Sequence, residues 1–105
     1  MFTSFNNITS KELIPGFSVQ LIHTESQTFA LFEIEKGAEL PEHFHIHEQV
    51  SQVLEGEFEL TIDGSTKICK KGDIAIMQPN VVHSGKAVTN CKILDVFTPV
   101  REDLK

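Results

Sequence analysis

Three histidines at alternate positions are the residues of this chain whose type and spacing best fit metal chemistry. They are His43, His45 and His47, each two positions from the next. They lie within residues 37–56, a stretch that begins and ends with glycine. Imidazole is the commonest protein ligand for transition metals, and alternate side chains of an extended strand point to the same face. The stretch therefore predicts a His-x-His pair of metal ligands, and a histidine-lined polar surface is the competing interpretation.

A metal site that does chemistry needs at least a third protein ligand, from another strand, and an open position. Within the same stretch, His47 has the parity of His45 and could replace one ligand. Glu48 could supply a carboxylate if the chain bends after His45. Further along the chain, His83 is the remaining candidate.

Short alternating apolar runs, separated by Gly, Pro and Asp, predict the elements that position these residues. The Asp-Gly dipeptide at residues 63–64 is a strong hairpin signal between two of the runs. No run carries a helical stripe, apart from a single turn at residues 101–105. The sequence therefore predicts an all-β sandwich or small barrel. Its strands are expected at residues 17–21, 29–33, 50–54, 57–62, 65–70, 74–77, 81–85 and 91–97.

The size and charge of the chain limit its organisation and its partners. Its 105 residues fit one domain, with a β-barrel over residues 11–105 after an N-terminal arm over residues 1–10. Because so small a core gains from pairing, we expect a homodimer in which the arm could lie on the partner. A formal net charge of -6 leaves no basic stripe for nucleic acid or for anionic membranes. The chain has no apolar run that could span a bilayer and no signal-peptide pattern at its start, so we expect it in the cytoplasm.

Two cysteines and one further histidine complete the set of reactive side chains. Cys69 and Cys91 are too far apart in the sequence for a zinc knuckle or a redox pair, so we expect buried thiols. His23 stands alone on a polar-facing run and is interpreted as a surface or interface residue. Since Trp and Tyr are absent, only Phe could stack against a sugar ring.

Two segments in register resemble the two motifs of the cupin family. The first motif is matched in spacing by Gly37, His43, His45, Gln49 and Gly56. The second is matched by a glycine and a histidine with ten residues between them, Gly72 and His83. The resemblance covers about residues 35–97, which is most of the chain.

This resemblance implies a double-stranded β-helix of the jelly-roll type, with one divalent metal in the mouth of the barrel. Nickel, zinc, iron and manganese all suit the implied ligands, which are His43, His45, Gln49 and His83. Gln49 stands where the family usually has Glu, so the ligand set is neutral and favours Lewis-acid chemistry over oxygenase chemistry. The second motif departs from the family pattern at three turn and support positions, Gln78, Asn80 and Ala87.

The end of the chain holds a second group of residues with chemical potential. Asp95 and Phe97 share one face of the last expected strand, and Arg101, the only arginine, follows it. A guanidinium is a planar, two-pronged donor that suits a substrate carboxylate. A surface ion pair between Arg101 and an acidic residue is the alternative interpretation.

Residues 95–103, together with residues 47–49 and 55–58, resemble the small pectin-degradation cupins of the KdgF type. The resemblance implies an enzyme that converts 4,5-unsaturated monouronates from pectin or alginate breakdown into linear ketonised sugars. It also implies a proton donor or acceptor, an apolar wall and a carboxylate contact, which are Asp95, Phe97 and Arg101. A cupin dioxygenase, an isomerase on another small acid and a non-catalytic small-molecule-binding cupin are the alternative functions.

Two side chains complete the expected pocket. Asp95, near a cation, is expected to be ionised and to act first as a base or through a water molecule. Ser51 shares the parity of Gln49 on its strand and could add a hydroxyl group to the pocket.

Overall fold

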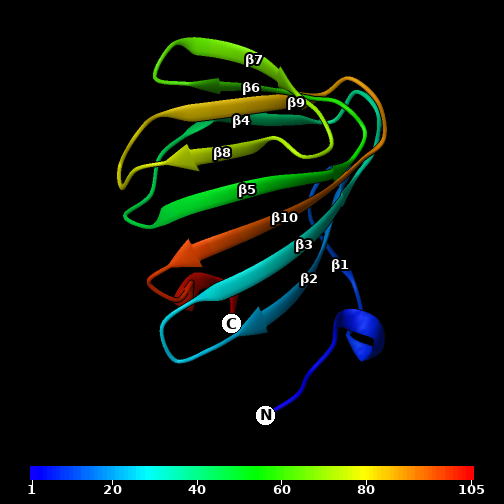
Figure 1. The fold of residues 1–105 in the computed structure, drawn as a ribbon, viewed down its shortest axis with the longest axis vertical. Helices are drawn as coiled ribbons and strands as arrows, with labels where there is room; N and C mark the ends of the chain where they lie inside the picture. Colours follow the sequence, from blue (N-terminus) through cyan, green and yellow to red (C-terminus); the bar gives the residue numbers. More distant parts are fainter.

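The computed structural model describes residues 1–105, which form two antiparallel β-sheets around one core (Figure 1). The six-stranded sheet has the order β1 (Lys11–Ile14), β2 (Phe17–His23), β3 (Thr28–Ile34), β10 (Cys91–Thr98), β5 (Glu48–Glu55) and β8 (Ile74–Met77). The four-stranded sheet has the order β4 (Glu39–His43), β9 (His83–Ala87), β6 (Phe58–Ile62) and β7 (Ser65–Cys69). Two short 3-10 helices flank the strands, η1 (Phe5–Asn7) and η2 (Glu102–Leu104). Neither is long or apolar enough to cross a membrane.

This architecture confirms the predicted all-β jelly roll, with local differences in the strand bounds. β8 has its predicted residues, whereas β9 begins two residues later than expected, at His83. Asn80 has a positive φ of 65°, and its backbone amide donates to the carbonyl of His45 at 2.7 Å. The turn before β9 therefore continues through residues 81–82, which the sequence had indicated as strand. β1 has no expected counterpart, because its Lys-Glu-Leu-Ile sequence does not alternate.

The core lies between the two sheets, and aromatic side chains join them. Phe17 in β2 packs edge-on against Phe32 in β3, with ring centroids 6.2 Å apart. It packs in the same way against Phe58 in β6 of the opposite sheet, at 6.4 Å. Such edge-to-face pairs add to the free energy that burial of the rings already provides.

β3 is apolar on both of its faces, so alternation alone does not identify the side that faces the core. Its inward residues are Ala30, Phe32 and Ile34, all buried. Phe29 and Leu31, two apolar residues of the strand expected at residues 29–33, lie half-buried on the outer face.

The cysteines and His23 do not belong to the group of side chains that could share a metal. Cys69 and Cys91 are buried free thiols, as predicted, and burial raises the pKa of each. His23 is half-buried at the end of β2, where its Nδ1 lies 2.8 Å from the hydroxyl of Thr28 in β3.

Gly85 in β9 allows the ring of Phe58 to pack directly against the strand. A Cβ atom at Gly85 would overlap that ring. We therefore expect Gly85→Ala to lower the free energy of unfolding by about 1–3 kcal/mol, the usual cost of overpacking a core. Urea denaturation measures the change, with Ser84→Ala on the neighbouring, half-buried position as the matched control. Equal stability of the two variants would contradict this close packing.

Candidate metal centre and adjoining cavity

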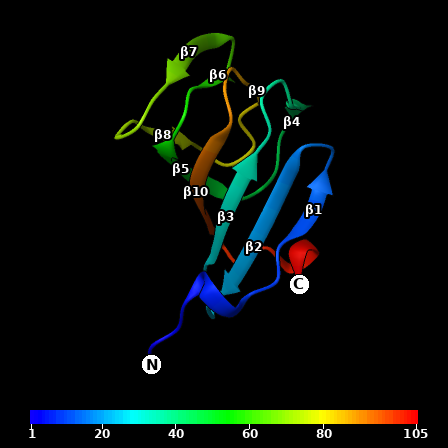
Figure 2. The same ribbon diagram turned by 90° about the vertical axis from the view of Figure 1, so that its right-hand side faces the viewer.

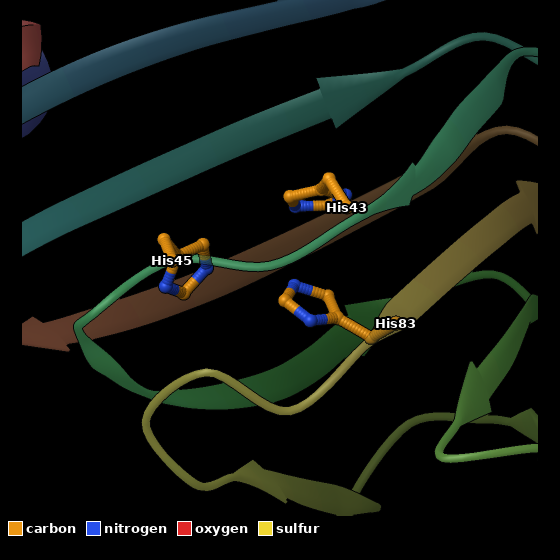
Figure 3. A group of neighbouring side chains, drawn as sticks. All are labelled: His43, His45 and His83. Atoms are coloured by element: carbon orange, nitrogen blue, oxygen red, sulfur yellow. The ribbon is translucent and has the colours of Figure 1, made fainter.

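Three histidines from two parts of the chain converge at one end of the barrel. His43 ends β4, His45 lies in the loop that follows, and His83 begins β9 (Figure 3). His43 and His83 are direct partners in the register of these antiparallel strands, which explains why their rings are close, with centroids 4.2 Å apart. One ligand atom from each of the three rings lies within 4.8 Å of the others. Nitrogen atoms that share one metal at about 2.0–2.1 Å are about 3–4 Å apart, so small movements of the rings suffice for common ligation.

Backbone carbonyl groups orient all three rings in the same way. The Nδ1 atoms of His43, His45 and His83 lie 2.8, 3.0 and 3.0 Å from carbonyl oxygens two residues away. A carbonyl only accepts, so each Nδ1 carries the proton and each Nε2 of the neutral ring keeps a free lone pair. Metal-bound histidines in proteins are oriented by the same kind of hydrogen bond.

His45 faces two oxygen acceptors at once. Its Nδ1 lies beside the carbonyl of His47, and its Nε2 lies 3.1 Å from Oε1 of Gln49. The amide of Gln49 is held in this orientation, because its Nε2 donates to Ser51 and Asp95 at 3.1 and 3.0 Å. A neutral imidazole has one N–H and cannot satisfy both acceptors, whereas a cation near Nε2 and Oε1 would interact favourably with both.

His83 provides independent evidence that the residues fit a metal. Its Nε2 is buried and has no hydrogen-bond partner. A buried polar nitrogen without a partner carries a free-energy cost, and coordination would remove it. The three imidazoles, with the amide oxygen of Gln49 beside them, are thus chemically suited to a divalent transition metal.

The two alternative ligands do not join this cluster. His47 is buried, and its ring packs against Phe97, with centroids 6.4 Å apart. Glu48 begins β5 opposite Thr98 and does not line the cavity beside the histidines. The predicted alternation of the three histidines is nevertheless present. Phe44 and Ile46, the residues between them, are each 65% exposed, whereas the histidines are buried or half-buried.

Asp95 lies behind Gln49, in a buried hydrogen-bond network. Its Oδ2 accepts from Nε2 of Gln49 at 3.0 Å, and its Oδ1 accepts from the hydroxyl of Ser51 at 2.5 Å. Burial raises the pKa of Asp95 to about 7, although these hydrogen bonds and the charge of Arg101 act in the opposite direction. In the protein without metal, desolvation of the carboxylate thus outweighs its partners and favours the protonated form of Asp95, whereas the expectation of an ionised Asp95 beside a bound cation stays a prediction.

Arg101 lines the cavity and also forms the ion pair with an acidic residue that was its alternative interpretation. Its guanidinium lies 4.6 Å from the ring centroid of Phe97 and lines the cavity, with only 15% of the side chain exposed. Its Nε and Nη2 also donate to the two carboxylate oxygens of Asp103, at 2.9 and 2.8 Å. The backbone amide of Arg101 donates to the hydroxyl of Thr28, which ties this segment to β3.

Asp103 is the residue beside the site that the sequence analysis did not single out. The hydrogen bonds from Arg101 lower the pKa of Asp103 to about 2, so its carboxylate stays charged. The available signal was an acidic residue two positions after the only arginine, within an expected helical turn.

A cavity of about 130 Å³ adjoins the histidine cluster. One water molecule needs about 10–15 Å³ of such volume, so the cavity has room for a small ligand. Part of its wall is apolar and belongs to the core, with Phe58, Leu60 and Ile93 among its residues. Its polar lining residues are His43, His45, Gln49, Ser51, Asp73, His83, Asp95 and Arg101.

The environment of His45 gives a prediction for the metal-free protein. Burial lowers the pKa of His45 to about 4, so the ring is neutral and able to bind a metal at neutral pH. We expect the imidazole resonances of His45 in an NMR titration to move with a midpoint near pH 4. A midpoint at the usual histidine value, near 6.5, would contradict the burial of this ring.

Comparison with known proteins agrees with the fold. The model of the Cupin domain family matches residues 30–97. The pectin degradation protein KdgF of Dickeya dadantii (strain 3937) is 37% identical over 70 residues, which are 65% of this chain and 64% of that protein. The match therefore spans less than two thirds of the length of that relative.

Two solved structures have nearly the same backbone. An RmlC-like cupin from Shewanella frigidimarina NCIMB 400 has a TM-score of 0.93 and 31% identity, over 99% of this chain and 95% of that one. KdgF from Halomonas sp. has a TM-score of 0.93 over 100% of both chains, and its 24% identity is a likeness of fold alone. The chain belongs to the cupin family.

Proposed function

We propose that this protein is a metal-dependent, non-redox enzyme that converts 4,5-unsaturated monouronates into linear ketonised sugars. The observation that carries the proposal is the buried carboxyl group of Asp95, which lines the same cavity as the three histidines and Arg101. Similarity to a pectin degradation protein supports a sugar acid of this class as the substrate.

The metal would be held by His43, His45, Gln49 and His83. Nickel, zinc, iron and manganese are all compatible with three imidazoles and an amide oxygen. When bound, the ion supplies Lewis-acid polarisation of sugar oxygens. Because all four ligands are neutral, they leave the charge of a divalent ion uncompensated, which favours polarisation over redox chemistry.

Arg101 and Phe97 would hold the substrate. A guanidinium has five N–H donors, and Asp103 accepts from two of them, so three remain for another carboxylate. The donors on the Nη1 and Nη2 edge can bind the acid group of a uronate with two hydrogen bonds. Phe97 lines the cavity next to Arg101 and offers an apolar surface to the sugar ring.

Asp95 would move the proton. Opening of the unsaturated ring yields an enol, which becomes a ketone when its oxygen loses a proton and its carbon gains one. A carboxyl group whose pKa is about 7 can accept and release a proton near neutral pH. Gln49 and Ser51 donate to the two oxygens of Asp95, which fixes the orientation of the group.

The proposed reaction has a direct optical test. The conjugated enol acid absorbs in the ultraviolet, and the ketonised product does not. We expect metal-replete protein to remove this absorbance faster than the spontaneous reaction does. Equal decay with and without the protein would rule out the proposed substrate.

A second candidate is non-catalytic binding of a small organic acid, which the apolar part of the cavity wall favours. In that case the protein would bind the unsaturated uronate, and chromatography would recover the compound unaltered. Conversion of the compound would exclude this candidate.

The ion pair of Arg101 gives a prediction about substrate affinity. We expect Asp103→Asn to raise KM about 3- to 10-fold, because Arg101 loses a charged partner and is less well oriented. Since Asp95 is untouched, kcat should change little. Glu102→Gln is the matched control, because Glu102 pairs only with Lys105 in the same turn. A KM equal to that of the control would show that Asp103 does not position Arg101.

A further inference from the structure

The segment that carries Arg101 is bonded to the sheet through the peptide unit between Val100 and Arg101. Figure 2 shows this part of the chain, coloured red, crossing β2 after the end of β10 and before it ends in η2. The N–H of the unit, which belongs to Arg101, donates to the hydroxyl of Thr28 at 2.8 Å. Its carbonyl, which belongs to Val100, accepts from the backbone amide of Glu102 at 3.1 Å. Both polar groups of the unit are bonded, which fixes the direction in which the Arg101 side chain leaves the backbone.

Thr28 is a buried and fully bonded acceptor for this segment. It begins β3, has the parity of the core residues of that strand and is completely buried. In the sheet register it lies between Phe97 in β10 and His23 in β2. Its oxygen accepts from the amide of Arg101, and Nδ1 of His23 lies 2.8 Å from the same oxygen, so the hydroxyl hydrogen can be donated to that nitrogen. A hydroxyl with two such partners has a fixed orientation.

His47 meets the same segment from the loop between β4 and β5. Its buried ring packs edge-on against Phe97, with centroids 6.4 Å apart. Burial, followed by the charge of Arg101, lowers the pKa of His47, although the charge of Asp103 and a hydrogen bond to the backbone of Val100 act in the opposite direction. Because a ring N–H donates to a carbonyl, His47 holds the other side of the peptide unit that Thr28 holds at its N–H.

The second ring nitrogen of His47 shows that packing alone does not account for a histidine at this position. Its Nδ1 is buried and has no hydrogen-bond partner. Such a nitrogen carries a free-energy cost that a purely apolar ring would avoid. The backbone of His47 has a separate contact, since its carbonyl accepts from Nδ1 of His45 at 3.0 Å. His47 thus contacts a candidate metal ligand through its backbone and the Arg101 segment through its ring.

We propose that Thr28 and His47 are positioning residues, which hold the peptide unit before Arg101 so that its guanidinium is presented to the cavity. The proposal rests on the function proposed above, in which this guanidinium binds the acid group of the substrate. Neither Thr28 nor His47 lines the cavity, so both act through Arg101. Asp103 holds the guanidinium at Nε and Nη2, and the two positioning residues hold the backbone behind it. A side chain fixed at both ends loses less conformational entropy when it binds a carboxylate.

Thr28→Val tests the proposal, because it removes the hydroxyl and keeps the shape of the side chain. We expect KM for the unsaturated uronate to rise about 5- to 30-fold, since the N–H of Arg101 loses its acceptor and the guanidinium loses its position. The value of kcat should stay that of the wild-type protein, because Asp95 keeps its partners. Thr28→Ser retains a hydroxyl and should restore most of the wild-type KM. Thr61→Val is the matched control, because it removes a hydroxyl that bonds to Thr66 at 2.7 Å outside the cavity.

A second test does not depend on the reaction, because Arg101 is the only arginine of the chain and gives a single Nε–H signal in a nitrogen–proton NMR spectrum. A saturated uronate, which has the acid group but cannot react, should shift this signal in the metal-replete wild-type protein. Thr28→Val should need about 5- to 30-fold more of the compound for the same shift. His47→Phe keeps a buried ring without the N–H and should weaken binding in the same direction. Elemental analysis of His47→Phe should find the wild-type metal content.

Three results would overturn the proposal. These are a Thr28→Val protein that matches the Thr61→Val control in KM and in the titration, a Thr28→Ser protein as impaired as Thr28→Val, and an Arg101 signal that the saturated uronate does not shift. If this signal behaves as expected while the unsaturated uronate stays unaltered, the proposed reaction is wrong and the positioning role is supported. Circular dichroism shows whether each variant folds. If Thr28→Val does not fold, the titration of His47→Phe decides the question.

Discussion

Replacement of His45 by alanine is expected to remove metal from the protein. His45 is the ring that faces both His83 and Gln49, so its loss leaves two imidazoles that cannot enclose an ion by themselves. Loss of a residue that merely supports a ligand costs about 10- to 100-fold in metal affinity, so loss of the ligand itself should cost at least about 100-fold. Elemental analysis after dialysis should find about one divalent ion per wild-type chain and almost none in His45→Ala.

His23→Ala is the matched control for this experiment. His23 is half-buried in β2, and its ring contacts Thr28 rather than the other histidines. This variant should keep a full complement of metal. Equal metal content in His45→Ala and in the wild-type protein would show that the metal binds elsewhere.

Replacement of Asp95 by asparagine is expected to abolish most of the turnover of an unsaturated uronate. The amide has nearly the same shape as the carboxyl group but cannot accept and release a proton near neutral pH. General acid–base catalysis contributes about 100- to 10,000-fold, and kcat should fall by a factor in this range. The loss of ultraviolet absorbance under saturating substrate measures kcat directly.

Two controls separate this catalytic effect from a structural one. Asp63→Asn makes the same chemical change in the turn between β6 and β7, where the positive φ of 47° suits asparagine as well as aspartate. It should keep the wild-type rate. Asp95→Asn should also keep its metal, because the cluster of imidazoles is unchanged. Wild-type turnover in Asp95→Asn would exclude this residue as the proton carrier.

Strand periodicity and turn residues are local properties, and they were sufficient to predict an all-β fold, whereas the jelly roll was implied by the resemblance to the cupin motifs. Ile74–Met77 and the hairpin before Ser65 were identified from alternation and from an Asp-Gly turn. The limit was reached in Thr28–Ile34, where both faces are apolar and alternation cannot distinguish the core side. The side that faces the core depends on the neighbouring strands, which are distant in the sequence.

For the site, the resemblance to the cupin motifs was enough to select the three histidines that come together, whereas spacing alone left His47 open, and neither indicated their surroundings. The protonation of Asp95 depends on how completely the folded chain excludes water from it, which no local pattern records. The pairing of Arg101 with Asp103 depends on the conformation of a single turn after β10. Both features arise from the three-dimensional packing of the end of the chain.

The carbonyl groups that orient the imidazoles have a consequence for how the protein would acquire its metal. Each carbonyl belongs to the same short segment as its ring, in Pro41, His47 and Val81. The ligands are therefore prearranged by their own loops and need no carboxylate from elsewhere in the fold. Loading and removal of the ion would involve little reorganisation, so one folded scaffold could exchange its metal with the supply in its surroundings.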